Sequence, residues 1–167
     1  MMVSEIRDYS TGGKVMFKAF DELPAMVNKT PFYRTIAMEL VKVDHEGSVV
    51  RLKSDHKHKN ILGTIHGGAL ASLADSACSL SLAPYLKEGE TMITISLHVD
   101  YIATGSKGDL TGQGKVIHRG RRLIRAEAVI TDEEERLIAK GYATLINTSL
   151  HEYRTNEDPE DPEDPMA

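Results

Sequence analysis

One apolar segment, Ala69–Leu82, most strongly limits how this chain can fold. The segment contains no Gly or Pro and consists mostly of Ala, Leu and Ser. This pattern predicts a single helix that is apolar on most sides and therefore buried. A Gly-rich stretch, Asn60–Gly68, leads into the helix, and Pro84 follows its end. The rest of the chain must therefore surround one central helix.

Strand patterns make up most of that surrounding chain. Two of them precede the helix, and four follow it with polar or Gly-rich turns between them. They are Ile36–Val43, Ser48–Lys53, Thr91–Tyr101, Leu110–His118, Leu123–Thr131 and Leu137–Asn147. In the third, residues that alternate at a period of two are expected to share one face: Ile93, Ile95, Leu97, Val99 and Tyr101. The order predicts an α+β fold in which one long antiparallel β-sheet wraps around a central α-helix.

A sheet of this kind keeps open edges, and one helix covers only part of one face. We therefore expect a two-fold homodimer, formed by edge pairing into a continuous sheet or by helix packing. The sequence leaves open whether two dimers associate into a homotetramer.

The two ends differ from this body. Lys14–Leu23 shows a short amphipathic helix pattern, and Pro24 discourages its continuation. The last twelve residues carry six acidic residues, no base and three Glu-Asp-Pro repeats. Charge repulsion and proline predict a disordered tail, most simply a solubilising extension and otherwise an interaction tail. We expect a helical lead-in over 1–35, the wrapped sheet over 36–150 and the tail over 151–167.

Composition excludes several classes of protein. Without its acidic tail the chain is nearly neutral, so it lacks the basic surplus of nucleic-acid-binding proteins. Its longest uncharged stretches are too short for a membrane helix, and the first residues lack a secretory apolar core. We therefore expect a cytoplasmic protein without membrane insertion. The single cysteine, Cys78, excludes an internal disulfide and a multi-cysteine zinc site, and a buried structural role is favoured for it.

Asp75 is the anomaly within the apolar helix. An ionised carboxylate in apolar surroundings costs several kcal/mol unless partners satisfy it. The helical neighbours Ser72, Ser76 and Ser79 form a narrow polar stripe beside it. Asp75 is therefore either a structural residue, bonded to these hydroxyls or facing solvent, or a candidate catalytic base.

The stretch before the helix offers a second chemical feature. Its glycines allow the backbone to approach a ligand closely, and the free N–H groups of a helix N-terminus suit a developing oxyanion. Gly67 precedes Asp75 by eight residues, which is about 12 Å along one helix. If the two residues act on one substrate, they must come from different subunits.

At this point the chain resembles a known family. The pattern Asn60-x-x-Gly63-x-x-His66-Gly67-Gly68, followed by Leu73-Ala74-Asp75, is similar to the signature of hotdog-fold acyl-CoA thioesterases of the phenylacetate-pathway (PaaI-like) type. Later segments continue the resemblance over most of the body: Ile93–Tyr101, Val116–Arg121 and Leu137–Gly141. The resemblance implies the hotdog fold and the hydrolysis of an acyl-CoA thioester to a free acid and coenzyme A.

The resemblance also implies roles for five residues. Asp75 matches the family's acid, which activates water or attacks the thioester as a nucleophile. Gly67 matches the N–H that polarises the carbonyl, and Asn60 the side chain that positions the thioester or water. Thr94 falls where relatives carry a Ser or Thr that helps to place water. His66 lies at the turn facing the carbonyl, where a positioning role is favoured over that of a general base.

The coenzyme A side has its own candidates. In relatives, one loop touches the nucleotide end of coenzyme A, and it corresponds here to His118, Arg119, Gly120, Arg121 and Arg122. Guanidinium groups suit phosphate oxygens, although a solvated basic turn explains the same residues equally well. Tyr101 matches a position that lines the same groove. Relatives often place Pro soon after that tyrosine, and this chain departs from them with Ile102-Ala103-Thr104-Gly105.

The expected reaction needs no metal and no other cofactor. The alternative to hydrolysis is a non-catalytic acyl-CoA-binding or sensing protein on the same fold, while a hotdog dehydratase fits the motif order poorly. The two imidazoles of His56-Lys57-His58 could form a metal pair, but no third ligand is evident and a solvated loop is favoured.

Overall fold

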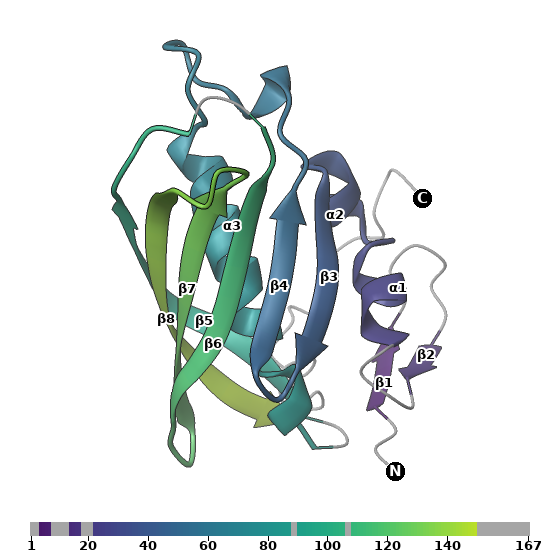
Figure 1. Ribbon diagram of the computed structural model, residues 1–167. Helices are drawn as coiled ribbons and strands as arrows, with labels where there is room; N and C mark the ends of the chain where they lie inside the picture. Colours follow the sequence, from purple (N-terminus) through teal and green to yellow (C-terminus); the bar gives the residue numbers. More distant parts are fainter. Residues whose placement is uncertain (1–3, 8–13, 18–21, 88–89, 106–107, 150–167) are drawn as a thin grey trace, which may run out of the picture.

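The computed structural model describes residues 4–7, 14–17, 22–87, 90–105 and 108–149. It confirms the expected fold class, because a six-stranded antiparallel sheet wraps around one long helix (Figure 1). The strands are β1 (Ser4–Arg7), β2 (Lys14–Phe17), β3 (Met38–Asp44), β4 (Gly47–Leu52), β5 (Glu90–Tyr101), β6 (Leu110–Arg119), β7 (Leu123–Asp132) and β8 (Leu137–Ser149). The helices are α1 (Leu23–Val27), α2 (Pro31–Thr35) and α3 (Gly67–Leu80), with the 3₁₀ turns η2 (His56–His58) and η3 (Ala83–Tyr85).

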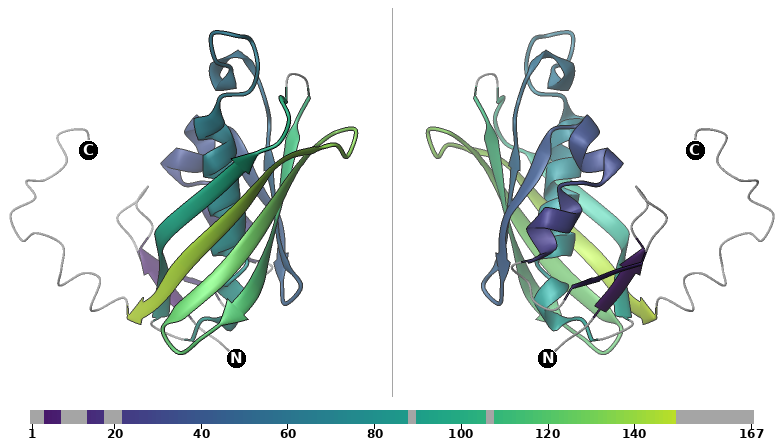
Figure 2. Two further views of the ribbon diagram at one scale, coloured as in Figure 1. Left: turned by 90° about the vertical axis from the view of Figure 1, so that its left-hand side faces the viewer. Right: turned by 90° about the vertical axis from the view of Figure 1, so that its right-hand side faces the viewer.

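The large sheet has the strand order β3-β4-β6-β7-β8-β5, while β1 and β2 form a separate two-stranded sheet. All pairings in the large sheet are antiparallel. Figure 2 shows how strongly the sheet curves, so that its concave face encloses α3. The predicted central helix and all six predicted body strands are therefore confirmed, with ends shifted by a few residues.

Helix α3 lies close to the sheet because small residues face each other there. Ala74 and Ala77 are fully buried on the helix. Opposite them are glycines: a Cβ placed on Gly141 would lie 2.7 Å from the Ala74 Cβ, and one on Gly114 would lie 1.9 Å from the Ala77 carbonyl oxygen. The Ser48 hydroxyl donates a 2.6 Å hydrogen bond to that carbonyl oxygen. These close contacts with the sheet therefore fix the position of α3.

The N-terminal prediction is partly wrong. Lys14–Phe17 is strand β2, paired with β1, rather than the first half of a helix. The weak helix preference of a few apolar residues at helical spacing is overridden by this main-chain strand pairing. Pro24 lies in the first turn of α1. The absence of an N–H costs no helical hydrogen bond there, because an N–H in the first turn has no acceptor within the helix. The predicted acidic tail, 151–167, lies outside the described residues, and the three-segment division stays a prediction.

The predicted alternation along β5 is wrong near its start. A register shift against β8 occurs between Thr94 and Ser96, so the intervening Ile95 is an extra residue in the strand. After this bulge, Leu97 and Val99 pack against the core, whereas the Ile95 side chain is 54% exposed. Before it, Thr94 is half-buried and pairs with the buried Leu145. The bulge places Thr94, not Ile95, on the side of the helix.

The two edges of the large sheet are not equivalent. On β3, the Asn28 amide accepts a 2.7 Å hydrogen bond from the Leu40 N–H and donates a 3.1 Å bond to the Leu40 carbonyl. This side chain occupies the place of a neighbouring strand. In the part of the chain that the structure describes, β5 pairs with β8 alone, so its outer edge is available for pairing. No helix among the described residues is long and apolar enough to cross a membrane.

Candidate active site

Apart from Thr94, the predicted site residues fall into three groups within one chain. Asn60, His66, Gly67 and Tyr101 lie around the N-terminus of α3, at the top of Figure 1, and Asp75 lies about two helical turns below. The third group occupies the β6–β7 hairpin, at the opposite end of the sheet: His118, Arg119, Gly120, Arg121 and Arg122. A single chain therefore does not bring these groups together.

The first turn of α3 is built by His66 as its N-cap. The His66 Nδ1 accepts a 2.9 Å hydrogen bond from the Gly68 N–H. A neutral His66 therefore carries its proton on Nε2 and presents a donor there, which suits positioning better than proton abstraction. Gly67 is the first helical residue, so its N–H has no acceptor within the helix.

Tyr101 closes one side of this turn. Its hydroxyl donates a 3.2 Å hydrogen bond to the Gly67 carbonyl, and its ring would lie 3.3 Å from a Cβ at position 67. The residue predicted to line the coenzyme A groove therefore touches the residue predicted to polarise the thioester carbonyl.

The Asn60 side chain holds its own loop together. Its Oδ1 accepts from the N–H groups of Leu62 at 2.9 Å and Thr64 at 3.2 Å, and its Nδ2 donates to the Thr64 hydroxyl at 2.8 Å. The amide nitrogen carries two hydrogens, and the bond to the Thr64 hydroxyl uses one of them. Asn60 thus shapes the loop, and its second Nδ2–H makes no hydrogen bond with a described residue.

Asp75 is half-buried on α3, and its polar neighbours do not satisfy one of its carboxylate oxygens. Its Oδ1 is buried without a hydrogen-bond partner among the described residues. The neighbouring hydroxyls point elsewhere: Ser72 donates to the Gly68 carbonyl at 3.0 Å and Ser79 to the Ser76 carbonyl at 3.3 Å. The reading of Asp75 as a structural residue held by this serine stripe is therefore not supported for Oδ1.

The charge of Asp75 contributes to raised pKa values of two other side chains, Tyr33 and Cys78. Burial raises the pKa of the Tyr33 hydroxyl to about 12, with the nearby Asp75 carboxylate adding to the shift and a hydrogen bond with Ser76 opposing it. Burial and then the charge of Asp75 also raise the pKa of Cys78 to about 12. Cys78 is therefore a protonated buried thiol, as expected. Sequence patterns gave no sign that the Tyr33 hydroxyl of α2 bonds Ser76, the neighbour of Asp75.

Thr94 lies too far along β5 to meet the α3 N-terminus of its own chain. Tyr101 lies seven positions further along the strand, which is about 23 Å in an extended chain. Its half-buried position on the helix side of the sheet is compatible with a role near Asp75 but not near Gly67 of the same copy.

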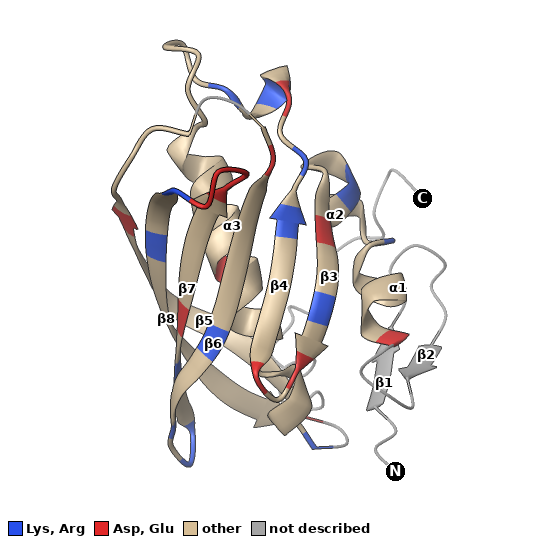
Figure 3. Ribbon diagram, viewed as in Figure 1, with Lys and Arg blue, Asp and Glu red and all other residues tan. Residues whose placement is uncertain are grey.

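The hairpin between β6 and β7 presents its charges to solvent. Figure 3 shows the basic residues gathered at this turn. The Arg119 guanidinium lies 5.2 Å from the centre of the Tyr85 ring. Arg121 and Arg122 are exposed and form no ion pair with a described residue. Gly120 allows the tight turn, since a Cβ there would lie 2.8 Å from the Leu123 carbonyl oxygen.

The two histidines of η2 do not form a metal pair. His56 is 97% exposed, in agreement with a solvated loop, whereas the His58 side chain is only 4% exposed, which that interpretation missed. No group of three or more potential metal ligands occurs within the described ranges. The sequence pattern Asp55-x-x-His58 could have indicated that His58 is not a solvated loop residue, because Asp55 and His58 form a capping box around η2.

Comparisons with known proteins agree with this architecture. The model of the thioesterase superfamily matches residues 62–139. The 1,4-dihydroxy-2-naphthoyl-CoA hydrolase of Listeria monocytogenes is 30% identical over 111 residues, which cover 66% of this chain and 90% of that protein. Acyl-coenzyme A thioesterase 13 of Mus musculus is 27% identical over 135 residues, covering 78% of this chain and 88% of that protein.

Solved structures share the same fold. A protein described as from the thioesterase superfamily gives a TM-score of 0.69 at 30% identity, covering 78% of this chain and 98% of that chain. The PaaI protein from the phenylacetic acid degradation operon of E. coli gives 0.69 at 19% identity, covering 77% and 92%. With its wrapped sheet, central helix and His66–Gly68 helix start, the chain belongs to the thioesterase superfamily of hydrolases and has the hotdog fold of its PaaI-like members.

Proposed function

We propose that this protein hydrolyses an acyl-CoA thioester to a free acid and coenzyme A. The observation that carries the proposal is the buried Oδ1 of Asp75, which no described residue bonds, on the central helix of a thioesterase fold. Leaving a buried carboxylate oxygen without a partner costs free energy. A bound water or thioester beside Asp75 would supply the missing interaction.

The complete site requires two copies of the chain. The β5 edge is open while Asn28 blocks the β3 edge, so we propose a homodimer in which β5 pairs with β5 of the second copy. Two-fold symmetry makes this pairing antiparallel, and the two α3 helices then run in opposite directions. Gly67 of one copy would lie beside the Asp75 region of the other, and the hairpin with Arg121 would approach the far end of the substrate.

Asp75 acts on the water in this scheme. Its carboxylate removes a proton as the water oxygen attacks the carbonyl carbon, and Thr94 helps to place that water. The carbonyl oxygen gains negative charge and is stabilised by the Gly67 N–H of the other copy, with His66 and Asn60 orienting the group. The C–S bond then breaks, and the sulfur receives the proton from Asp75.

A nucleophilic route has the same overall balance. Asp75 would attack the carbonyl itself, and coenzyme A would leave as the thiolate. Water would then hydrolyse the resulting anhydride to the free acid and the Asp75 carboxylate, and the proton released would convert the thiolate to the thiol. Both routes use only side chains, main-chain N–H groups and water. At the hairpin, the exposed Arg119, Arg121 and Arg122 would bind the phosphates of the nucleotide end.

Thiol release from a panel of short, long and aromatic acyl-CoAs tests the proposal, with Asp75→Asn beside the wild type. This variant removes the charge and keeps the shape, and we expect kcat to fall by at least about a hundredfold, the low end for an acid–base residue. Glu134→Gln is the matched control, because it removes a carboxylate charge at an exposed turn.

Equal activity of Asp75→Asn and wild type, with both folded, would refute Asp75 as the catalytic group. No thiol release from any substrate, with binding of coenzyme A esters retained, would instead favour the alternative of a non-catalytic acyl-CoA-binding protein. Activity confined to one acyl class would identify the substrate.

A further inference from the structure

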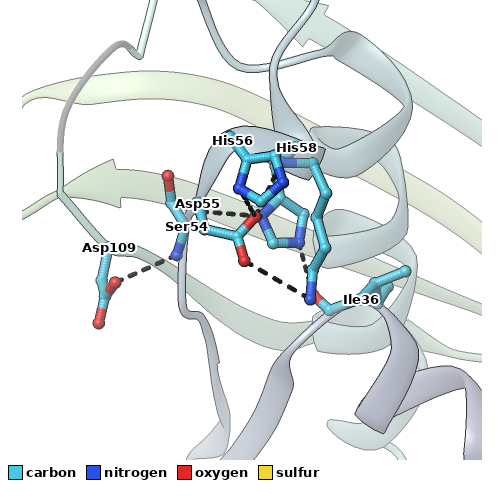
Figure 4. Close-up of polar contacts among 7 residues, drawn as sticks. Ile36, Ser54, Asp55, His56, His58 and Asp109 are labelled. Atoms are coloured by element: carbon cyan, nitrogen blue, oxygen red, sulfur yellow. Dashed lines mark hydrogen bonds and ion pairs between the residues drawn. The ribbon is translucent and has the colours of Figure 1, made fainter.

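His58 is a buried titratable residue that the chemistry described above does not use. It ends the 3₁₀ turn η2, between strand β4 and the loop that leads into α3. Its side chain is only 4% exposed, and Figure 4 shows its ring between Asp55 and Ile36. A buried imidazole is expected to have partners on its ring nitrogens, and both ring nitrogens of His58 have polar neighbours.

The two ring bonds match a single tautomer of the neutral ring. The His58 Nδ1 lies 3.0 Å from the Asp55 nitrogen, whose N–H can only donate, so in the neutral ring Nδ1 carries no proton. The Asp55 Oδ1 lies 3.3 Å from the same Nδ1. Nε2 lies 2.9 Å from the Ile36 carbonyl oxygen, which can only accept, so Nε2 carries the proton. The second bond joins residues 22 positions apart and ties η2 to the junction of α2 and β3.

The main chain of His58 continues this connection to the helix. Its carbonyl oxygen accepts a 2.7 Å hydrogen bond from the N–H of His66, the N-cap of α3. Lys59 and Ile65 form the next bridge, so the loop that carries Asn60 is closed at its base by these two contacts. The position of the Gly67 N–H therefore depends on these two contacts at the foot of the loop, which the His58 ring connects to Ile36.

We propose that His58 is a positioning residue that holds the first turn of α3, and with it the Gly67 N–H, in place for the thioester carbonyl. This inference rests on the proposed function. Its physical reason is that a donor aimed at developing charge acts only in the correct place, and a displacement of about 1 Å can cost about a hundredfold in rate. His58 touches neither substrate nor water in this scheme.

Substitutions at His58 separate its two ring bonds. His58→Gln keeps a donor that reaches the Ile36 carbonyl, His58→Asn keeps only the acceptor for the Asp55 N–H, and His58→Ala keeps neither. We expect kcat to fall about 10- to 100-fold in His58→Ala with KM changed less than about threefold, because transition-state stabilisation is lost. His58→Gln should restore most of kcat, and His58→Asn should not.

His56→Ala is the matched control, since it removes the other imidazole of the same turn, which is 97% exposed. Wild-type kcat in folded His58→Ala would overturn the proposal. So would equal kcat for His58→Gln and His58→Asn, a comparison that still decides the matter if His58→Ala fails to fold.

Amide hydrogen exchange provides a readout that does not depend on activity. We expect His58→Asn to speed exchange at the His66 N–H while the amides of β7 keep their wild-type rates, and ¹⁵N NMR of the wild type to show the Nε2–H tautomer. Unchanged exchange at His66 would contradict the proposal. If the wild type releases no thiol, the proposed function fails, and these measurements still test whether His58 holds the helix start.

Discussion

Replacing Gly114 by Ala tests how α3 is positioned on the sheet. The added Cβ would lie 1.9 Å from the Ala77 carbonyl oxygen and 2.8 Å from the Ser48 hydroxyl. Carbon–oxygen contacts of this kind are normally roughly 3.3–3.6 Å. Because the obstructing atom is main chain, strand and helix must separate by about 1.5 Å. The Ser48–Ala77 hydrogen bond cannot survive such a shift unchanged.

The expected cost follows from these contacts. Overpacking typically costs about 1–3 kcal/mol, and a backbone collision belongs at the upper end of that range. The loss of one buried hydrogen bond adds about 1 kcal/mol. The sum, about 4 kcal/mol, is a large fraction of the roughly 5–15 kcal/mol that stabilise a typical domain, and it corresponds to a Tm lowered by about 8–16 °C for a chain of this size.

Urea and thermal unfolding would measure this effect against two controls. Gly112→Ala lies on the same face of β6, but its Cβ would meet the flexible Leu73 side chain at 3.0 Å, so we expect a cost of about 1 kcal/mol. Ser48→Ala removes the hydrogen bond alone. If Gly114→Ala were as stable as Gly112→Ala, the close approach of α3 to β6 would be refuted.

Two further predictions concern charge. Arg121→Ala should raise KM for coenzyme A esters about 10-fold with little change in kcat, because it removes a charge-assisted phosphate contact, whereas Arg125→Ala on β7 should not; steady-state kinetics with unchanged KM would contradict this. The hydrogen bond and charge of Arg136 lower the pKa of the buried Asp132. Its stabilisation is therefore present at neutral pH and lost as pH falls below about 4. The Tm difference between wild type and Asp132→Asn should shrink on acidification, and a constant difference would exclude the ion pair as its cause.

The elements of the fold were largely predictable because their signals are local. The apolar run of α3 and the alternating strands identify the wrapped sheet without reference to distant contacts. The bulge at Ile95 was not predictable, since it depends on the register between β5 and β8, and a single extra residue moves the following side chains to the other face. The helix prediction for Lys14–Phe17 was wrong for the same reason, because this strand forms by pairing with another segment, β1.

The candidate site was predictable in its residue types but not in its partners. The sequence placed Asp75 beside three serines, yet only the structure shows that Ser72 and Ser79 bond main-chain carbonyls instead. In the same way, the role of His58 depends on Ile36, 22 residues away. The separation of Gly67 from Asp75 was available from helix geometry alone, and it is the strongest argument for a shared site.

A heterodimer of two inactive variants tests that shared site most directly. Gly67→Pro removes the N–H at the first helical position, where proline is tolerated and the preceding His66 is already extended, and Asp75→Asn removes the acid. Co-expression with two different tags isolates dimers that contain one copy of each variant. Such a dimer has one site with both groups intact, so we expect thiol release at about half the wild-type rate per dimer, although each parent homodimer is inactive. If the doubly tagged dimer is as inactive as its parents, Asp75 and Gly67 do not act together across two copies, and the account of the active site is wrong.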